Sequence, residues 1–283
     1  MSSQVRPAWS SAFAPQAVRP LTLPIPLTNV TRAWAWGGST GQGVRVAVID
    51  SGIEHDHPAV GGQVVEGVAI EPDAAAPDGV RYTPEAQPQD RFGHGTACAG
   101  IIHGLAPEAE LVSVRVLGQD GRGKSIQFAA GIHWAIENNI QVINMSLSSS
   151  SEEYYPLFHR LADEAFFKGV MLVSAVNNVP APSYPSLYPS VFSVAAHEVQ
   201  DPFTYYYNPS PPVEFGAFGI DVKIAWANKG TMTSTGNSFA APHIAGLVAL
   251  ILAKHPGLTP FQVKTILHAC ASNVGGYDES DTK

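Results

Sequence analysis

Short apolar runs alternate with stretches of helical spacing along most of the chain. Runs of strand length lie near 44–50, 63–66, 111–117, 141–146, 170–175 and 191–196, and helical stretches lie near 94–103, 125–138, 156–168, 239–254 and 259–269. Strands that are apolar on both faces and alternate with helices are typical of a parallel sheet that is covered on both sides. The pattern therefore predicts an α/β fold with a doubly wound, mostly parallel sheet and helices on both faces.

The two ends of the chain lack this alternation. Residues 1–28 are rich in Pro, Ser and Ala without periodicity and predict an N-terminal arm, while residues 273–283 carry Gly and acidic residues and predict a flexible tail. We therefore expect one domain over residues 29–272. Inside it, the polar segment 73–89 contains three prolines and predicts a surface excursion.

The longest apolar run begins next to a serine. Residues 236–254 start with Gly-Asn-Ser and continue almost without a polar break. Because proline lacks an N–H group, Pro242 is expected in the first helical turn, which places Ser238 at or just before the start of a buried helix. The positive end of the helix dipole favours negative charge beside that hydroxyl. The alternative is an ordinary N-cap serine on a core helix.

Two distant stretches favour a chemical role for Ser238. Asp50 ends the apolar run 44–50, and His94 lies between glycines at the start of a helix of small residues. The carboxyl ends of parallel strands are where such folds gather their functional groups. A serine hydroxyl becomes a nucleophile only with a base in reach, and that base needs a third group to orient it. Asp, His and Ser in this chain order occur in known catalytic triads.

Three motifs resemble those of subtilisin-like serine proteases: Asp50-Ser51-Gly52, His94-Gly95-Thr96 and Gly236-x-Ser238-x-Ala240-x-Pro242-His243. The resemblance covers roughly residues 30–270. It implies a subtilisin-like fold and a serine endopeptidase that forms an acyl-enzyme on Ser238, with His94 as general base and Asp50 as its orienting partner. It also suggests a processing protease for a peptide precursor, similar to the maturation proteases of cyanobactin clusters.

The same resemblance implies residues that bind substrate. It places the oxyanion donor on Asn177, with Asn178 as a weaker candidate, and it places a glycine where this chain has Val176. A β-branched residue takes positive φ poorly, so the loop either follows another path or needs no glycine dihedral. This departure motivates an alternative, a catalytically impaired peptide-binding module. Substrate contacts are implied for Gly118, Gly121, Ser146, Leu147, Ser148, Ser174, Ala175 and Ser183, with an uncharged primary pocket for an apolar or medium-sized side chain.

Two other patterns suggest different chemistry. Residues 118–125 match the phosphate-binding pattern G-x-x-x-x-G-K-S, which alone would indicate a nucleotide-binding protein, but the strand near 141–146 supplies no aspartate for the metal of such a site. His55, Asp56 and His57 resemble a metal cluster. Three adjacent residues rarely converge on one ion, so a structural role is the preferred interpretation.

Composition and charge limit the classes of binding partner that we expect. The net charge of −8 gives no basic footprint for a nucleic acid, and no apolar run of transmembrane length is visible, so we expect a peptide or protein substrate with no nucleic acid and no membrane. The sequence does not indicate an oligomeric state. Cys98 and Cys270 are the only cysteines, and no secretory signal is readable, which favours a cytoplasmic location.

Two further expectations concern calcium and the N-terminal arm. Many subtilisin-like proteases bind calcium through a loop after the catalytic histidine helix, but here that helix runs directly into residues 104–107, so no metal or cofactor is expected. Residues 21–27 either form a plain surface arm or cross the cleft as an inhibitory strand, as the short extensions of intracellular subtilisins do.

Overall fold

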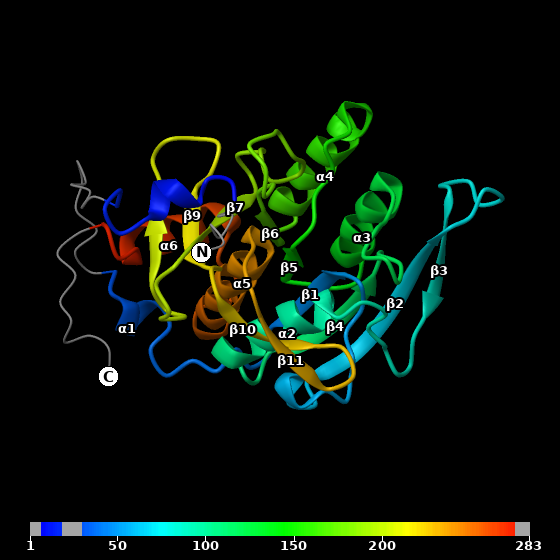
Figure 1. The fold of residues 1–283 in the computed structure, drawn as a ribbon, viewed down its shortest axis with the longest axis horizontal. Helices are drawn as coiled ribbons and strands as arrows, with labels where there is room; N and C mark the ends of the chain where they lie inside the picture. The colour runs from blue at the N-terminus through cyan, green and yellow to red at the C-terminus, as the bar shows by residue number, and fades with distance from the viewer. Residues whose placement is uncertain (1–6, 19–29, 275–283) are drawn as a thin grey trace, which may run out of the picture.

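The computed structural model describes residues 7–18 and 30–274 (Figure 1). Within these residues, nine strands form one sheet in the order β3-β2-β4-β1-β5-β6-β7-β9-β8. The seven strands from β2 to β9 in this order run parallel, and β3 and β8 pair antiparallel at the two edges. The strand bounds are β1 (Arg45–Asp50), β2 (Val64–Pro72), β3 (Val80–Pro84), β4 (Glu110–Arg115), β5 (Val142–Met145), β6 (Met171–Ala175), β7 (Phe192–His197), β8 (Tyr205–Tyr207) and β9 (Phe215–Phe218).

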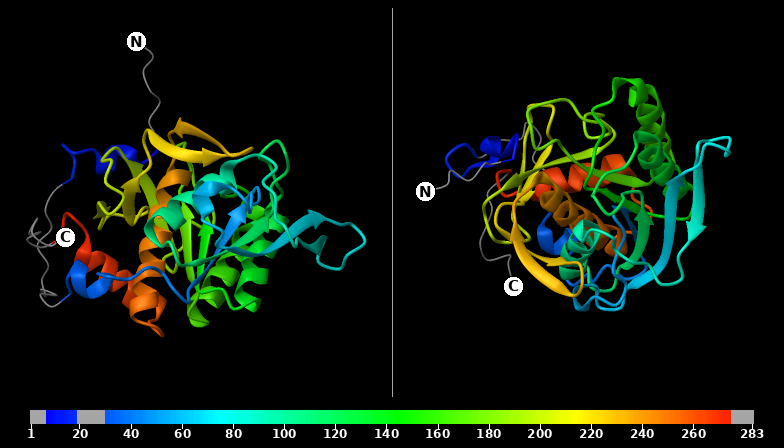
Figure 2. Two further views of the ribbon diagram at one scale, coloured as in Figure 1. Left: turned by 90° about the horizontal axis from the view of Figure 1, so that it is seen from below. Right: turned by 45° about the vertical axis from the view of Figure 1, so that its right-hand side comes forward.

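Helices cover both faces of the sheet, and a separate hairpin lies beside them (Figure 2). The helices are α1 (Arg32–Ala35), α2 (His94–Leu105), α3 (Ser125–Glu137), α4 (Tyr155–Phe167), α5 (Asn237–Lys254) and α6 (Pro260–Cys270), with the hairpin β10 (Val222–Trp226) and β11 (Gly230–Ser234). Short 3-10 turns are η1 (Ser10–Phe13), η2 (Pro58–Val60) and η3 (Glu152–Tyr154).

The alternation of side chains along β1 divides the core in two. Val46 and Val48 pack with α1, α2, α5 and α6 on one face, while Ala47 and Ile49 pack with α3 and α4 on the other. Successive strand residues point to opposite faces, so a run that is apolar throughout buries both sides of the sheet. The predicted doubly wound α/β fold is confirmed.

The predicted elements were found within a few residues of their expected positions, but several strands were not predicted. Strand β2 continues to Pro72, and the expected surface excursion contains β3, an edge strand with one buried residue. Strands β8 to β11 are three to five residues long and were missed. Strands β3 and β8 lie at the edges of the sheet and β10 and β11 lie outside it, where exposed residues weaken the apolar signal, while β9 lies inside the sheet but is only four residues long.

Helix α5 runs through the middle of the molecule (Figure 2). Its 18 residues have a mean hydropathy of 1.3, so length and composition alone would suit a membrane span, but 83% of this stretch is buried inside the protein. The apolar composition of α5 is therefore explained by its place as the central core helix. An all-round apolar helix of this kind needs neighbours on every side, and α2, β5, β6, β7 and β9 provide them.

Both ends of the described chain pack against the domain. Residues 10–13 of the expected arm form η1, which lies beside β7 and β9 (Figure 1), and Phe13 is buried. The inhibitory strand expected at residues 21–27 lies outside the described residues. At the other end, the Asn273 amide exchanges two hydrogen bonds with the backbone of Tyr207, which holds residue 273 against β8.

Candidate active site

Ser238 lies in the first turn of helix α5, and Pro242 lies one turn further inside the helix. The prediction that Pro242 would fall in the first turn is wrong. Because proline has no N–H group, the carbonyl of Ser238, four residues earlier, receives no helical hydrogen bond. The hydroxyl of Ser146 donates to this carbonyl at 2.7 Å, and the thiol of Cys98 donates to it at 3.6 Å. The end of β5 and helix α2 therefore hold the serine in place.

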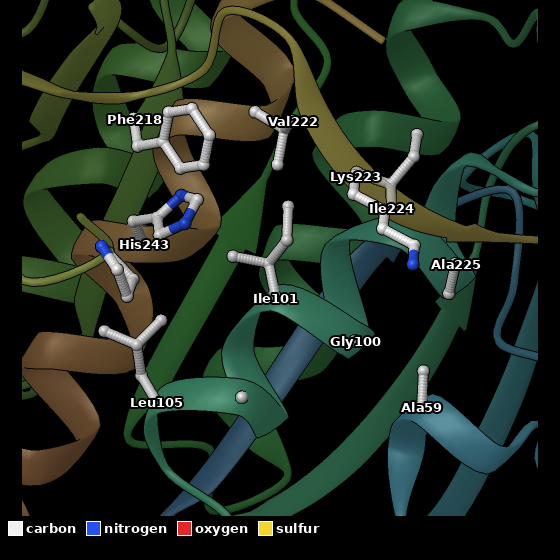
Figure 3. A pocket seen from close by; sticks show the side chains of 12 residues that line it. Ala59, Gly100, Ile101, Leu105, Phe218, Val222, Lys223, Ile224, Ala225 and His243 are labelled. Atoms are coloured by element: carbon white, nitrogen blue, oxygen red, sulfur yellow. The ribbon is translucent and has the colours of Figure 1, made fainter. Parts of the chain in front are cut away.

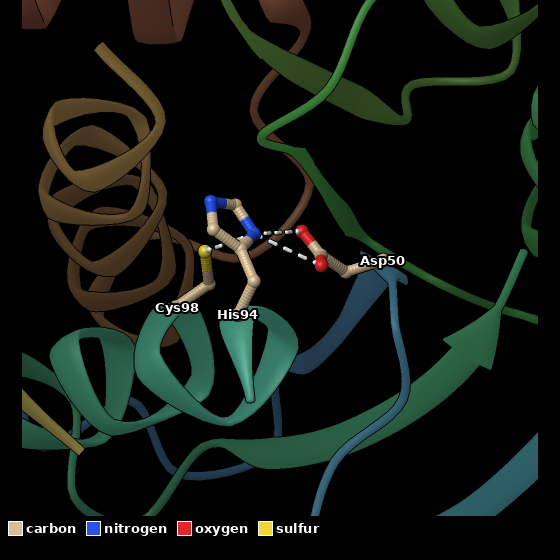
Figure 4. A group of neighbouring side chains, drawn as sticks. All are labelled: Asp50, His94 and Cys98. Atoms are coloured by element: carbon tan, nitrogen blue, oxygen red, sulfur yellow. Dashed lines mark hydrogen bonds and ion pairs between the residues drawn. The ribbon is translucent and has the colours of Figure 1, made fainter. Parts of the chain in front are cut away.

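Asp50 and His94 meet at the end of β1. The carboxylate of Asp50 is fully buried, and its two oxygens lie 2.9 and 2.8 Å from Nδ1 of His94. A carboxylate can only accept, so Nδ1–H donates to it and Nε2 carries the free lone pair. Figure 4 shows Nε2 pointing away from Asp50. The His94 ring also packs on that of Phe239, the residue after Ser238, with 5.3 Å between centroids.

The surroundings of His94 favour its charged form. Burial of the imidazole lowers its pKa, but the adjacent Asp50 carboxylate outweighs that effect and raises the pKa of His94 well above 6.5. The Cys98 thiol lies 4.0 Å from Nδ1, and burial raises the pKa of this thiol, so it is a neutral neighbour. A proton taken up by His94 is therefore stabilised by Asp50, as a general base requires.

Asp50, His94 and Cys98 also place their donor atoms within 4.8 Å of one another, close enough for a metal ion (Figure 4). Nδ1 of His94 is already committed to Asp50, and a cysteine binds metals as a thiolate, which the buried thiol disfavours. The arrangement fits a proton-transfer pair better than a metal site.

Asp90 fixes the start of the histidine helix. Its Oδ1 accepts hydrogen bonds from the backbone N–H groups of Phe92 and Gly93, and its Oδ2 accepts from both the N–H and the hydroxyl of Thr96. The hydroxyl of Ser51, next to Asp50, donates to Oδ1 at 2.8 Å and accepts from the N–H of Gly95. One carboxylate thus ties the end of β1 to the first turn of α2, the two segments that carry the Asp50–His94 pair.

Asp90 was not singled out from the sequence. An Asp that precedes a helix start by a few residues is a capping signal, and that signal was present. The second function of Asp90, binding Ser51, depends on the contact between residues 39 positions apart and was not readable.

The loop that follows β6 carries the predicted oxyanion donor. The Oδ1 of Asn177 accepts from the N–H of Val179 at 3.1 Å, which fixes the orientation of its amide, and its own N–H donates to Ser183. The side chain of Asn178 is instead used to accept from the N–H of Asn237 at 2.9 Å. Asn177 is partly buried and Asn178 is exposed. Because donors act more strongly where water is excluded, this arrangement favours Asn177.

Val176 takes no positive φ, so the loop needs no glycine dihedral at this position. Its N–H donates to the carbonyl of Val194 at 3.0 Å, which continues the pairing of β6 with β7 by one residue. The side chain is buried in a small cluster that includes Phe13. The departure from the family pattern is thus accommodated without strain.

Asn237, directly before Ser238, was not singled out from the sequence. It is fully buried, its Oδ1 accepts from the N–H of Ala196 at 2.9 Å, and its Nδ2 lies 3.0 Å from the carbonyl oxygens of both Asn177 and Ala8. Asn237 is the first residue of the helix rather than its N-cap, and only the fold reveals that its side chain connects the serine turn to the oxyanion loop.

The implied substrate residues divide into buried and accessible groups. The hydroxyls of Ser146, Ser174 and Ser183 are buried and hydrogen-bonded to Ser238, Ala175 and Ser186 respectively. Ala175 is also buried, Leu147 and Ser148 are half-buried, and Gly118 and Gly121 lie in the turn after β4. Their contribution to substrate binding stays a prediction.

Several backbone N–H groups of the turn at residues 118–125 are already hydrogen-bonded within the turn. The N–H of Gly118 donates to the carbonyl of Arg122 at 2.8 Å, that of Gly121 to the carbonyl of Gly118, and that of Arg122 to Asp120. A phosphate-binding loop needs such groups directed at its ligand. The alternative of a nucleotide-binding protein is thereby disfavoured.

The His-Asp-His segment has structural partners. Nδ1 of His57 accepts from the N–H of Ala59 and caps η2, so Nε2 carries the proton and donates to the carbonyl of Gly230. Asp56 pairs with Lys229 at 2.7 Å. These contacts agree with the structural interpretation.

A largely apolar pocket lies between α2, β10 and α5 (Figure 3). Its one histidine, His243, donates from Nδ1 to the carbonyl of Phe239, and burial lowers its pKa to about 4, so the ring is neutral. Asp50, His94 and Ser238 do not line this pocket, which separates it from the candidate catalytic groups.

Comparisons with known proteins agree with this geometry. The model of the subtilase family matches residues 41–282. The minor extracellular protease Epr of Bacillus subtilis (strain 168) is 33% identical over 250 residues, which are 83% of this chain but only 36% of Epr. Subtilisin BL of Lederbergia lenta is 32% identical over 250 residues, or 84% of this chain and 87% of that protein. The chain thus spans about a third of one relative and most of the other.

A solved structure supports the same relationship. The crystal structure of a cold adapted subtilisin-like serine proteinase superimposes with a TM-score of 0.66 and 27% identity, covering 84% of this chain and 86% of that one. Together with the Asp50–His94 pair, whose imidazole packs on Phe239 next to Ser238, the extent of these matches shows that the chain belongs to the subtilase family.

Proposed function

We propose that this chain is a serine endopeptidase that cleaves peptide bonds through an acyl-enzyme on Ser238. The observation that carries the proposal is the buried Asp50 carboxylate, 2.8 Å from Nδ1 of His94, beside the helix that bears the serine. Of the two ring nitrogens, Nε2 is left to act as the base, which is the nitrogen that this mechanism needs.

The reaction proceeds in two stages. Nε2 of His94 takes the proton of Ser238 Oγ while this oxygen attacks the peptide carbonyl carbon, and Asn177 donates to the oxygen that becomes negative. His94 then gives its proton to the leaving amine as the C–N bond breaks. A water molecule attacks the resulting ester, again losing its proton to His94, and the proton returns to Ser238 as the acid product leaves.

Two features favour this activity over the catalytically impaired peptide-binding module. Val176, the residue that motivated the module, holds its loop without positive φ. The Asp50–His94 pair retains the geometry of a proton acceptor, and a binding module has no use for it. The module remains the outcome to test against.

The substrate and location belong to the same proposal. Small, uncharged residues implied as pocket walls support an apolar or medium-sized side chain before the scissile bond, and a peptide precursor is the proposed natural substrate. Cys98 and Cys270 are free and buried, which supports a cytoplasmic location even though Epr is named an extracellular protease. Cell fractionation with an antibody tests the location, and recovery from the medium would contradict it.

A fluorophosphonate probe tests the activity. We expect it to label the wild-type chain and the Ser210→Ala control, whose serine lies in an exposed turn, but not Ser238→Ala. Hydrolysis of a peptide library is expected to follow the same pattern. Absence of labelling in the wild type, or labelling that survives Ser238→Ala, would refute the proposal, and a strong preference for Lys or Arg before the cut would refute the proposed pocket.

A further inference from the structure

The residues 7–13, which we term the N-terminal strap, are anchored by one aromatic ring. Phe13 is 1% exposed and packs with Val176, Ala195 and Val213. Gly216 on β9 makes room for the ring, because a Cβ there would lie 2.2 Å from a ring carbon of Phe13. No Cβ tolerates such an approach, so the site fits an aromatic ring only while residue 216 is glycine.

The other end of the strap bonds to both segments that flank the serine. The N–H of Ala8 donates to the carbonyl of Asn178 at 2.6 Å, and the carbonyl of Ala8 accepts from Nδ2 of Asn237 at 3.0 Å. Asn237 in turn donates its N–H to Oδ1 of Asn178. Three segments that are distant in sequence therefore meet one residue from Ser238.

We propose that the N-terminal strap is a positioning element for catalysis, which holds the oxyanion loop 176–178 against the turn that carries Ser238. Phe13 presses on the first residue of that loop, and Ala8 bonds to its last residue. The donor of the oxyanion hole, Asn177, lies between these two contacts. The inference rests on the proposed function, because positioning matters only if the serine reacts.

The physical basis is the precision that catalysis needs. A displacement of about 1 Å at a reacting group costs on the order of a hundredfold in rate. The loop 176–178 follows directly after β6. Val176 adds one more strand hydrogen bond, but Asn178 is exposed, so the position of the loop depends on its contacts with other segments. The strap supplies contacts at both ends of the loop.

This role has the opposite sign to inhibition. Among the described residues, the strap is hydrogen-bonded to Asn178 and Asn237, and these bonds do not involve Asp50, His94 or Ser238. Loss of an inhibitory segment would raise the rate, whereas loss of a positioning strap lowers it. The direction of the change therefore separates the two roles.

The first test replaces the anchor. We expect Phe13→Ala to lower kcat on a peptide substrate about tenfold to a hundredfold with KM changed less than twofold, and Phe13→Leu to recover most of the rate. Phe261→Ala, at a 68% exposed site on α6, is the matched control and should behave as wild type. Melting curves of all variants identify any that fail to fold, and if Phe13→Ala does not fold, Gly216→Ala, which displaces the same ring, carries the test. An unchanged or increased kcat in Phe13→Ala would overturn the proposal.

A double-mutant cycle tests the contact itself. Gly216→Ala places its methyl group where the Phe13 ring lies and should lower kcat in the wild-type background. In the Phe13→Ala background the ring is gone, so adding Gly216→Ala should cause little further loss. Independent, multiplicative losses would show that the two sites are not coupled through the strap.

Hydrogen exchange separates failure of this inference from failure of the proposed function. In the wild type, the N–H groups of Ala8 and Asn237 are hydrogen-bonded and should exchange slowly; both should exchange faster in Phe13→Ala. This readout needs no activity. An inactive wild type would refute the peptidase, while unchanged exchange at Asn237 would refute the strap.

Discussion

Asp90→Asn is expected to impair both stability and turnover, although the substituted residue touches no substrate. The Oδ2 of Asp90 accepts two hydrogen bonds from Thr96, at 2.8 Å from its N–H and 2.7 Å from its hydroxyl. An asparagine has only one acceptor oxygen and places an NH2 group on the other side. Whichever way the amide is turned, donors of the α2 start then face donors.

The expected size follows from these contacts. A hydrogen bond to a charged group contributes about 1.5–3 kcal/mol, and Thr96 is fully buried, so water does not replace its lost partner. Loss of two such bonds costs about 3 kcal/mol or more. With about 2–4 °C per kcal/mol for a domain of this class, Tm should fall by about 6–12 °C. Because His94 begins the affected helix, a shift of its ring should also lower kcat at least tenfold.

The assay combines thermal melting with kcat on one peptide substrate. Asp73→Asn is the matched control. In the turn between β2 and β3, Oδ1 of Asp73 likewise accepts a hydrogen bond from a backbone N–H group, that of Ala75. This variant should leave Tm and kcat near wild type. If Asp90→Asn equals this control in both readouts, the carboxylate does not hold the start of α2, and the reasoning is refuted.

Four further outcomes test the site and the fold. Asn177→Ala should lower kcat about a hundredfold to a thousandfold and Asn178→Ala less than tenfold, and the reverse order would move the oxyanion role. The value of kcat/KM should rise with pH until His94 is neutral, at a pH well above 6.5, and a profile already level at pH 6 would contradict the raised pKa. His197 and His243 are buried with pKa values of about 4, so each should cost about 2–3 kcal/mol of unfolding free energy between pH 7 and pH 4.5, measured by urea titration. Excess chelator should leave Tm unchanged, because α2 runs unbroken to Leu105 without an inserted loop, and a drop of many degrees would reveal a calcium site.

The parts of the fold that could be read from the sequence share one property, burial on both faces. Strand β1 is apolar at most positions because helices cover both faces of the sheet, so the strand can be recognised from its own residues alone. Strand β3 has a single buried residue, and Tyr205–Tyr207 is too short for a period. Their pairing is fixed by partners that lie elsewhere in the chain, which local patterns do not contain.

The residues of the candidate site likewise fall into those that local motifs predict and those that depend on distant contacts. Asp50, His94 and Ser238 stand in local motifs and were predicted with their roles. Asn237 acts through contacts with segments about 40 to 230 residues away, and no local pattern encodes them. Pro242 was misjudged because the rule for proline assumes that the freed carbonyl stays unpaired, whereas Ser146 pairs with it.

The pairing of that carbonyl with the end of β5 has a mechanical consequence. Helix α5 lacks one internal hydrogen bond where Pro242 follows Ser238, so the position of its first turn depends on contacts outside the helix as well as on the helix itself. Ser146, which follows β5, holds the Ser238 carbonyl of this first turn, and β5 pairs directly with β1, the strand that carries Asp50. We therefore expect substitutions in the C-terminal half of α5 to lower stability more than they change the chemical step.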